Sequence, residues 1–412
     1  MSSRHLTADS PWLLALLATL VALGPLSVDM YLPAMPAMRV ALATDVGSVQ
    51  LTLSAYLAGF AVFHLFCGPL ADRYGRKPVI TAGTLLFIAA CVGCSLATTI
   101  DELLTYRFLQ GIGACVGPTL ARTITRDLFG PRRAARALSL IAMLMALAPA
   151  VAPSLGSLLM LFFPWRSIFV FLGLYGALIL IVLHRYLGES LPVRQSLHPG
   201  TIARNYAVLL RSGRFMAVVV SSSFVYAGMM VYLASSGFVY IEMLQLPVKY
   251  FGPIFLTTVA GYIAGSAVSA RLSSHLDSVR VLLIGTVVVA VASVSMAVAG
   301  TLFDTRVASL AIPMMLYTAG MGLTLPHAMG LALQPYPHMA GTASALLGFI
   351  QMAVSAAAGG LIGLFLHDSP QPMLLGILLL GLTGLALALL ASRLHTRADD
   401  MVQAQHNDPQ EH

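Results

Sequence analysis

The feature that most constrains this chain is a series of apolar runs, each about 20 residues long, which recurs along the whole sequence. Such a run crosses roughly 30 Å of hydrocarbon as a helix, whereas a membrane barrel shows short segments of alternating polarity. Apolar residues make up 58% of the 412 residues and charged residues only 9%, against about 25% charged residues in a water-soluble domain. The sequence therefore predicts an all-α integral membrane protein.

Hydropathy, with proline, glycine and charged residues as boundary signals, predicts twelve transmembrane helices. The expected spans are approximately 12–37, 48–70, 78–98, 102–124, 135–161, 165–187, 214–240, 248–272, 279–302, 305–330, 340–366 and 370–393. The longest segment between spans, Gly188 to Gly213, divides them six and six. We expect four regions: an N-terminal six-helix half at 1–187, a cytoplasmic linker loop at 188–213, a C-terminal six-helix half at 214–395 and a polar C-terminal tail at 396–412.

Two sequence patterns recur at one offset and support this division. The fourth span contains Gln110-Gly-Ile-Gly113 and the tenth contains Ala319-Gly-Met-Gly322, each followed by a proline. The fifth span contains Ala152-Pro-Ser-Leu-Gly156 and the eleventh contains Ala358-Gly-Gly-Leu-Ile-Gly363. Because both pairs lie 206 to 209 residues apart, the sequence predicts two pseudo-symmetric halves.

The positions of the basic residues predict the orientation. With the N-terminus in the cytoplasm, seventeen Lys and Arg residues fall in cytoplasmic segments and four in the opposite loops. This is the positive-inside pattern, so we expect both termini in the cytoplasm and the chain in the inner membrane. The net charge of +7 would suggest nucleic acid in a soluble chain, but here topology explains it and we expect no nucleic-acid partner.

The most distinctive motif lies between the second and third spans, from Gly68 to Pro78. It reads Gly-Pro-Leu-Ala-Asp-Arg-Tyr-Gly-Arg-Lys-Pro, and it resembles the loop signature of the major facilitator superfamily. The matching positions are Gly68, Asp72, Arg73, Gly75, Arg76 and Lys77. The resemblance implies a transporter whose two six-helix halves rock about a central cavity.

Two further segments extend the resemblance. Arg107–Gly113 is similar to the span-four motif of the family. Asp29–Pro36 is similar to the span-one sequence of its twelve-span drug/proton antiporters, particularly the bicyclomycin and chloramphenicol resistance (Bcr/CflA) group. The fifth span departs from the antiporter pattern Gly-Pro-x-x-Gly-Gly, since it reads Ala-Pro-Ser-Leu-Gly-Ser from Ala152 to Ser157. That departure weakens the argument from this motif for the direction of transport.

Asp29 is the one acidic residue well inside a predicted span. A carboxylate in hydrocarbon costs several kcal/mol unless it is neutralised or paired, so a carboxyl there is expected to have a function. Helix geometry places Asp29 about 13 Å and Arg107 about 9 Å below the same surface, which would allow them to meet. We therefore predict proton coupling through Asp29 and Arg107, with a static ion pair that fixes helix packing as the alternative.

The loop signature implies a gate. In the resembling family the motif's Asp caps a helix of the other half and its Arg pairs with an acid at the inner end of span four; the matching residues are Asp72, Arg76 and Asp127. The eleventh span begins near Gly341-Thr342 and offers a helix N-terminus with unsatisfied N–H groups and a positive dipole. These contacts would hold the inner gate shut. Charge that only sets topology is the alternative, but it does not explain Asp72.

Flexible helix positions and an adaptable cavity are expected to serve alternating access. Proline frees backbone groups and glycine allows close helix approach, so we expect hinges at Pro149, Pro153 and Gly156. Met and aromatic side chains accommodate varied shapes. The expected lining residues of the substrate cavity are Tyr31, Tyr56, Gln110, Met145, Tyr226, Met230, Phe238 and Tyr262. For each of them, a lipid-facing or helix-packing role is the alternative.

These features predict a proton-coupled secondary active transporter, and not an enzyme, that exports small amphipathic compounds such as phenicol- or bicyclomycin-like drugs. The sequence has neither a G-x-x-x-x-G-K-[ST] nucleotide pattern nor a cluster with metal-ligand spacing, so we expect no cofactor or metal and the proton gradient as energy source. The expected partners of the monomer are its substrate, protons and the lipid bilayer. A proton-linked or facilitative transporter of a nutrient or metabolite is the alternative, and an integral-membrane enzyme or sensor a remote one.

Overall fold

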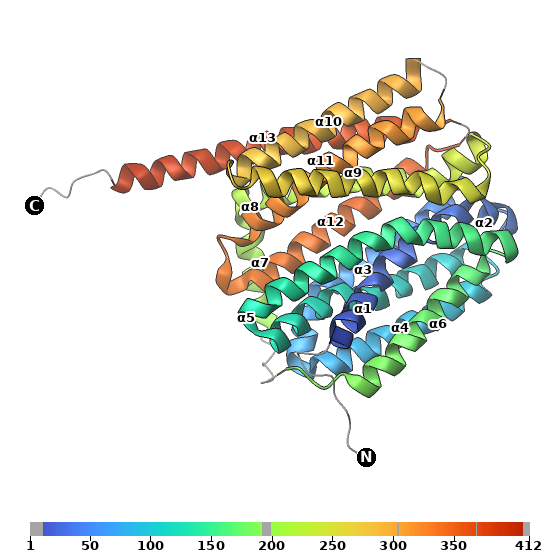
Figure 1. Ribbon diagram of the computed structural model, residues 1–412, viewed down its shortest axis with the longest axis horizontal. Helices are drawn as coiled ribbons and strands as arrows, with labels where there is room; N and C mark the ends of the chain where they lie inside the picture. Colours follow the sequence, from blue (N-terminus) through green and yellow to red (C-terminus); the bar gives the residue numbers. More distant parts are fainter. Residues whose placement is uncertain (1–10, 192–198, 303–304, 368, 407–412) are drawn as a thin grey trace, which may run out of the picture.

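The protein is a bundle of long helices that pack side by side (Figure 1). The computed structural model describes residues 11–191, 199–302, 305–367 and 369–406, without the side chains of residues 11, 130–136, 138–140, 142–147, 199, 302 and 397–406. All regular structure in these ranges is helical, which confirms the predicted fold class. The helices are α1 Pro11–Asp29, η1 Leu32–Ala34, α2 Met35–Ala41, α3 Val46–Tyr74, α4 Arg76–Leu96, α5 Ile100–Phe162, α6 Arg166–Tyr186, α7 Pro199–Arg211, α8 Gly213–Ser236, η2 Gly237–Met243, η3 Val248–Tyr250, α9 Phe251–Leu272, α10 Ser278–Leu302, α11 Val307–Leu333, η4 Pro337–Met339, α12 Ala340–Gly363 and α13 Gln371–His406.

The helix α5 contains two of the predicted spans. Its 63 residues would measure about 95 Å if straight. However, Arg166, just beyond its end, donates a hydrogen bond of 2.8 Å to the carbonyl oxygen of Ala97, just before its start. The helix must therefore turn back on itself, as Figure 1 shows. With the ten helical segments elsewhere in the described chain that are long and apolar enough to cross a membrane, the two arms of α5 give the twelve spans expected from the sequence.

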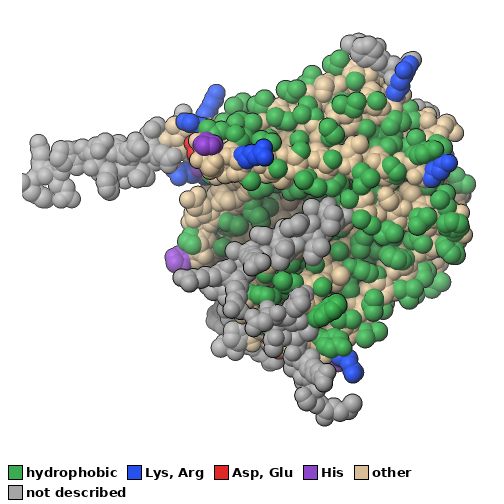
Figure 2. Space-filling view, viewed as in Figure 1, with side chains coloured by type: hydrophobic (Ala, Val, Ile, Leu, Met, Phe, Trp, Pro, Cys, Tyr) green, Lys and Arg blue, Asp and Glu red, His purple; other side chains and the backbone are tan. Residues whose placement is uncertain are grey.

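The outer surface of the bundle is apolar. Figure 2 shows hydrophobic side chains spread over the described part of the visible face, with few Lys and Arg side chains among them. Large apolar side chains such as Leu174, Ile181 and Leu379 are more than half exposed. In water such a surface would be a strong aggregation hazard, whereas in lipid it is the required one. The chain is thus a multi-pass membrane protein.

The internal repeat appears in how the helices cross. In the first half, Gly59 of α3 lies against the backbone of α5, where an added Cβ would come within 2.1 Å of the Phe108 oxygen. In the second half, Gly265 of α9, 206 residues further on, lies in the same way against α11, with the Ala319 oxygen 1.9 Å from an added Cβ. Small residues allow such close crossings in membrane proteins. The predicted pseudo-symmetry therefore rests on matching backbone contacts.

Because α3 is a long helix, it defines the two ends of the bundle. Asp45 caps its N-terminus and Asp72 lies in its last turn. We call these the Arg39 end, after the arginine of the neighbouring α2, and the Asp72 end. The Asp45 carboxylate accepts hydrogen bonds of 2.8 Å from the backbone N–H and the hydroxyl of Ser48. These bonds hold the pKa of Asp45 below its usual value.

Two elements differ from the sequence prediction. The first span is interrupted after Asp29, where α1 ends and the chain continues through η1 and α2. The prolines of this segment, Pro33 and Pro36, occupy the first turns of these short helices, where a missing N–H costs nothing. The predicted linker loop contains a helix, α7, whose Tyr206 hydroxyl donates a hydrogen bond of 3.0 Å to the Leu65 oxygen of α3.

The crossing of α3 and α5 provides the first prediction. The substitution Gly59→Ala should destabilise the protein by about 2 kcal/mol, because the new methyl group collides with backbone that cannot move alone. Thermal unfolding of the purified protein measures this loss. The matched control is Gly330→Ala in α11, where an added Cβ meets nothing within 4 Å. Equal melting temperatures for the two variants would contradict the close-packed crossing.

Candidate functional site

Arg107 is a cation fully buried within the first half of the bundle. It is 0% exposed, and its guanidinium carbon lies 4.4 Å from the ring centre of Tyr31 and 4.6 Å from that of Tyr56. Its Nη1 donates hydrogen bonds of 2.6 Å to Gln110 Oε1 and 3.2 Å to the Ser27 oxygen. Its Nε and Nη2 have no described partner. The positive charge is therefore held mainly by aromatic faces and carbonyl dipoles.

Asp29 is buried where the first span is interrupted. Its side chain is 4% exposed, and neither a hydrogen bond nor an ion pair joins its carboxyl to another residue in the described part of the chain. Asp29 and Arg107, which the sequence predicts could meet, are thus not paired in this structure, although both lie inside the bundle. Their role in proton coupling stays a prediction.

The signature loop forms a charged cluster around Arg76, which is 6% exposed. Its Nη1 donates to Asp72 at 2.5 Å and its Nε donates to Asp127 at 3.2 Å. The pairing of Arg76 with Asp127 is the one that the family resemblance implies. Arg73 is exposed and lies over the ring of Tyr74.

A carboxylate that the sequence analysis did not single out completes this cluster. Glu189 accepts hydrogen bonds from the backbone N–H groups of Arg76, at 2.9 Å, and Lys77, at 3.2 Å. It thereby satisfies donors at the N-terminus of α4, where a negative charge is favourable. Gly75 has a φ of 106°, and a Cβ there would come within 2.5 Å of the Glu189 carboxylate. The glycine is therefore needed for both the turn and the approach of Glu189.

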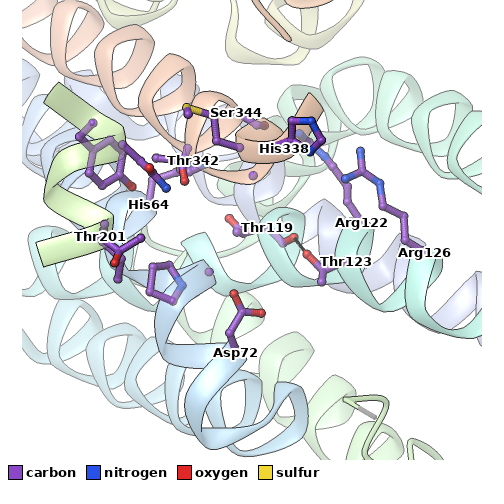
Figure 3. A pocket seen from close by; sticks show the side chains of 18 of the residues that line it. His64, Asp72, Thr119, Arg122, Thr123, Arg126, Thr201, His338, Thr342 and Ser344 are labelled. Atoms are coloured by element: carbon purple, nitrogen blue, oxygen red, sulfur yellow. Dashed lines mark hydrogen bonds between the residues drawn. The ribbon is translucent and has the colours of Figure 1, made fainter. Parts of the chain in front are cut away.

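A cavity of about 540 Å³ opens between the two halves at the Asp72 end. It is polar, and Figure 3 shows charged, imidazole and hydroxyl side chains around it. The lining residues come from α3, α4, α5, α7, η4 and the start of α12. The labelled ones are His64, Asp72, Thr119, Arg122, Thr123, Arg126, Thr201, His338, Thr342 and Ser344. Asp72 and Thr342 lie on its walls, so Asp72 does not cap α12 here. The contact of Asp72 with α12 that the resemblance implies is therefore not made among the described residues, and a gate at this end stays a prediction.

The opposite, Arg39 end is closed by contacts between the halves. Arg39 of α2 forms an ion pair with Glu242 of η2, and both side chains are about one-third exposed. Deeper in the bundle, Gln50 Nε2 of α3 lies 3.2 Å from both the Ala234 oxygen and the Ser235 hydroxyl of α8. The close approach of Gly237 to the Leu32 oxygen seals the same region. One end of the bundle is therefore open and the other shut.

The residues predicted to line a substrate cavity fall into three groups. Tyr31, Tyr56 and Gln110 surround Arg107 inside the first half. Tyr226, Met230, Phe238 and Tyr262 belong to the second half, where Met230 and Phe238 are buried and the two tyrosines partly buried. The side chain of Met145 lies outside the described residues. None of the seven described side chains lines the cavity at the Asp72 end.

The predicted hinge residues lie in the second arm of α5, which packs against both halves. An added Cβ at Gly156 would come within 2.2 Å of the Met30 oxygen, at the interruption of the first span. Ser154, two residues earlier, lies against Gly252 of α9. Pro149 and Pro153 occupy neighbouring turns of the same helix. The residues around Gly156 therefore contact both the interruption of the first span and α9. Their role as a hinge stays a prediction.

Sequence reasoning missed Glu189, Glu242 and the cavity position of Arg122. Glu189 is an acidic residue in a segment whose other charged residues are basic. Such a residue is only a weak signal that its carboxylate accepts hydrogen bonds from a neighbouring element. Glu242 follows directly after a predicted span, near an outer loop with few charges. Arg122 falls within the predicted fourth span, and in the structure it lines the cavity.

Comparison with protein families agrees with this architecture. The model described as "Major Facilitator Superfamily" matches residues 17–360, which is most of the chain. The structure resembles that of a bacterial homologue of the human lysosomal transporter Spinster, solved in an inward-facing and unoccupied conformation. The TM-score is 0.74 at 15% identity, with 93% of this chain and 96% of that chain covered.

Two curated relatives carry names that mention resistance. The multidrug resistance protein MdtL of Escherichia coli O157:H7 is 32% identical over 363 residues, covering 87% of this chain and 90% of that protein. The bicyclomycin resistance protein homologue of Haemophilus influenzae is 28% identical over 364 residues, with 87% and 90% covered. The similarity therefore extends over nearly the whole length of each protein.

The stacked environment of Arg107 generates a prediction. The substitution Arg107→Lys keeps the charge but should cost about 2 kcal/mol of stability, because an ammonium group cannot lie flat between two rings and donate to Gln110 at once. Thermal unfolding measures the loss, with Arg204→Lys on the exposed side of α7 as the control. Full stability of Arg107→Lys would show that the rings do not hold the guanidinium.

The ion pair at the Arg39 end generates another. An exposed pair contributes up to about 1 kcal/mol, so Glu242→Gln should raise the population open at this end about fivefold. Spin labels at the exposed positions Val40 and Lys249, one on each half, measure the change as a longer distance. Exchanging the charges, by Arg39→Glu together with Glu242→Arg, should restore the short distance. An unchanged distance distribution in Glu242→Gln would show that the ion pair of Arg39 with Glu242 does not hold this end closed.

Proposed function

Since this chain belongs to the major facilitator superfamily, we propose that it is a proton-coupled secondary transporter that exports small amphipathic compounds, including drugs. The observation that carries the proposal is the asymmetry of the bundle: an ion pair and buried hydrogen bonds close the Arg39 end while a cavity opens at the Asp72 end. A transporter that alternates access needs such a state and its converse. The resistance names of two relatives support a drug as substrate.

We propose that the Asp72 end faces the cytoplasm of a bacterial cell and that the protein lies in the inner membrane with both termini inside. The excess of basic residues in the segments of that end supports this orientation. The cavity is then open to the cytoplasm, from which an exporter takes its substrate. The protein needs no cofactor, works as a monomer and uses the proton gradient.

Asp29 is proposed as the proton carrier. In the structure it is buried with no described cation beside it, and an isolated carboxylate is costly there. The carboxyl is therefore neutral in the state open at the Asp72 end. When the bundle opens at the other end, or when Arg107 shifts toward it, the charged form is favoured and the proton leaves. One charge crossing 100 mV supplies about 2.3 kcal/mol.

Asp72 and Arg76 are proposed as the gate at the cytoplasmic end. In this state Asp72 is held by Arg76, which also binds Asp127. Closure of the cavity would bring Asp72 to the N-terminus of α12, where unsatisfied N–H groups favour a carboxylate. The bending segment at Pro149, Pro153 and Gly156 lies between the halves and would accommodate the movement. The tyrosines Tyr226 and Tyr262, together with Met230, are proposed to contact substrate in the second half.

The test is transport into energised inverted vesicles by the wild type and Asp29→Asn. The wild type should accumulate drug only with a proton gradient, and Asp29→Asn should lose accumulation against a gradient while still exchanging substrate across the membrane. A panel of drugs in a pump-deficient bacterial host identifies the substrate. Accumulation by Asp29→Asn with normal pH dependence would contradict coupling at this residue. Unchanged susceptibility to every drug, with pH-independent solute uptake, would favour a nutrient transporter instead.

A further inference from the structure

The cavity at the Asp72 end has an excess of positive charge on one wall. Arg122 and Arg126, one turn apart on α5, both line it, and Figure 3 shows them on the side of the cavity where His338 lies. Residues four apart share a helix face, so both charges act on the same space. Arg122 is partly buried, and no hydrogen bond or ion pair joins it to another residue in the described part of the chain. Its charge is therefore available to a ligand.

A second part of the cavity wall is formed by the N-terminus of α12. Gly341, Thr342, Ser344 and Ala345, from the first two turns of this helix, line the cavity. The N-cap residue, Met339, makes no side-chain capping bond. The first N–H groups of a helix without a cap attract anions through their dipole and their free donors. The hydroxyls of Thr342 and Ser344 add donors on the same wall.

The charges of the lining residues do not cancel. Arg76 is already paired with Asp72 and Asp127, which leaves the two α5 arginines uncompensated within the described lining. His64 also lines the cavity, and its buried Nδ1 has no described hydrogen-bond partner. Buried polar atoms without partners are uncommon and need an explanation. Two arginines, a helix N-terminus and several hydroxyls around one space form a typical binding arrangement for phosphate, sulfate or carboxylate groups.

We infer that this cavity binds the anionic group of a small molecule between Arg122 of α5 and the N-terminus of α12. The inference refines the proposed function, because the entry cavity of the exporter then selects amphipathic compounds that carry a carboxylate, sulfate or phosphate group. Selection of transported compounds by the anion site rests on the proposed function, whereas anion binding by the purified protein does not. The bound anion occupies the helix end that Asp72 would reach on closure, so anion and gate compete.

The test measures thermal unfolding of the purified full-length protein in sodium sulfate and in sodium chloride at equal ionic strength. Sulfate also stabilises proteins generally by exclusion from their surface, so the comparison between variants is decisive. The wild type should show a saturable rise in melting temperature with sulfate. Arg122→Gln should need about tenfold more sulfate for the same rise, as expected for loss of a charge-assisted hydrogen bond. Asp72→Asn should need less sulfate than the wild type, because it removes the competing carboxylate.

The control is Arg204→Gln, which removes a positive charge from α7 outside the cavity and should leave the sulfate response unchanged. Arg126→Gln serves as a second variant, with a weakened response expected, if Arg122→Gln does not yield folded protein. Equal sulfate responses in the wild type and in both arginine variants of α5 would overturn the inference, as would an equal response to chloride. Nanodiscs of phosphatidylcholine with and without phosphatidylglycerol distinguish the source of the anion. Loss of the sulfate response only with phosphatidylglycerol would assign the site to a lipid phosphate and overturn the small-molecule ligand.

Discussion

The behaviour of this protein depends on how charge is held inside an apolar bundle. Water cannot solvate Asp29 or Arg107, so each needs a partner, a polarisable surface or a proton. Arg107 has its partners: two tyrosine rings, the Gln110 amide and a backbone carbonyl. Asp29 has none in the described chain, and only a proton removes its cost. Arg107 keeps its charge beside these partners, whereas Asp29 is the residue for which we propose a change of charge.

The few charged residues also distinguish the two ends of the bundle. The Arg39 end is shut by one ion pair across the halves and by the amide of Gln50. At the Asp72 end the ion pairs of Arg76 stay within the first half, so they hold no helix of the second half. Because α3 runs from Asp45 to Asp72 as one helix, closing one end and opening the other can be a single rigid tilt. Contacts worth about 1 kcal/mol at either end are enough to shift the equilibrium between the two states of the bundle.

The sequence predicts the number and placement of the spans because hydrocarbon imposes length and composition on each one. It predicts the repeat from glycines such as Gly113 and Gly322, which lie where helix backbones approach closely. The ion pair of Arg39 with Glu242 joins residues 203 apart, and no local pattern encodes such a meeting. Tyr31 and Tyr56 were expected to line a cavity, and in the structure they stack on Arg107. The sequence does not distinguish these two roles, because both need a tyrosine that faces into the bundle. Hydropathy did not predict the linker helix α7, because hydropathy detects apolar spans and not polar helices at the surface.

We propose that Asp29 carries a proton in the state that is open at the Asp72 end and releases it during the cycle. Infrared difference spectroscopy of the purified protein, comparing the wild type with Asp29→Asn, reports this directly. We expect the carbonyl absorption of a protonated carboxyl in the wild type, and this absorption should be missing from Asp29→Asn and should disappear when the protein is driven into the converse state. An ionised Asp29 in both states, or a protonated one that never changes, would contradict it.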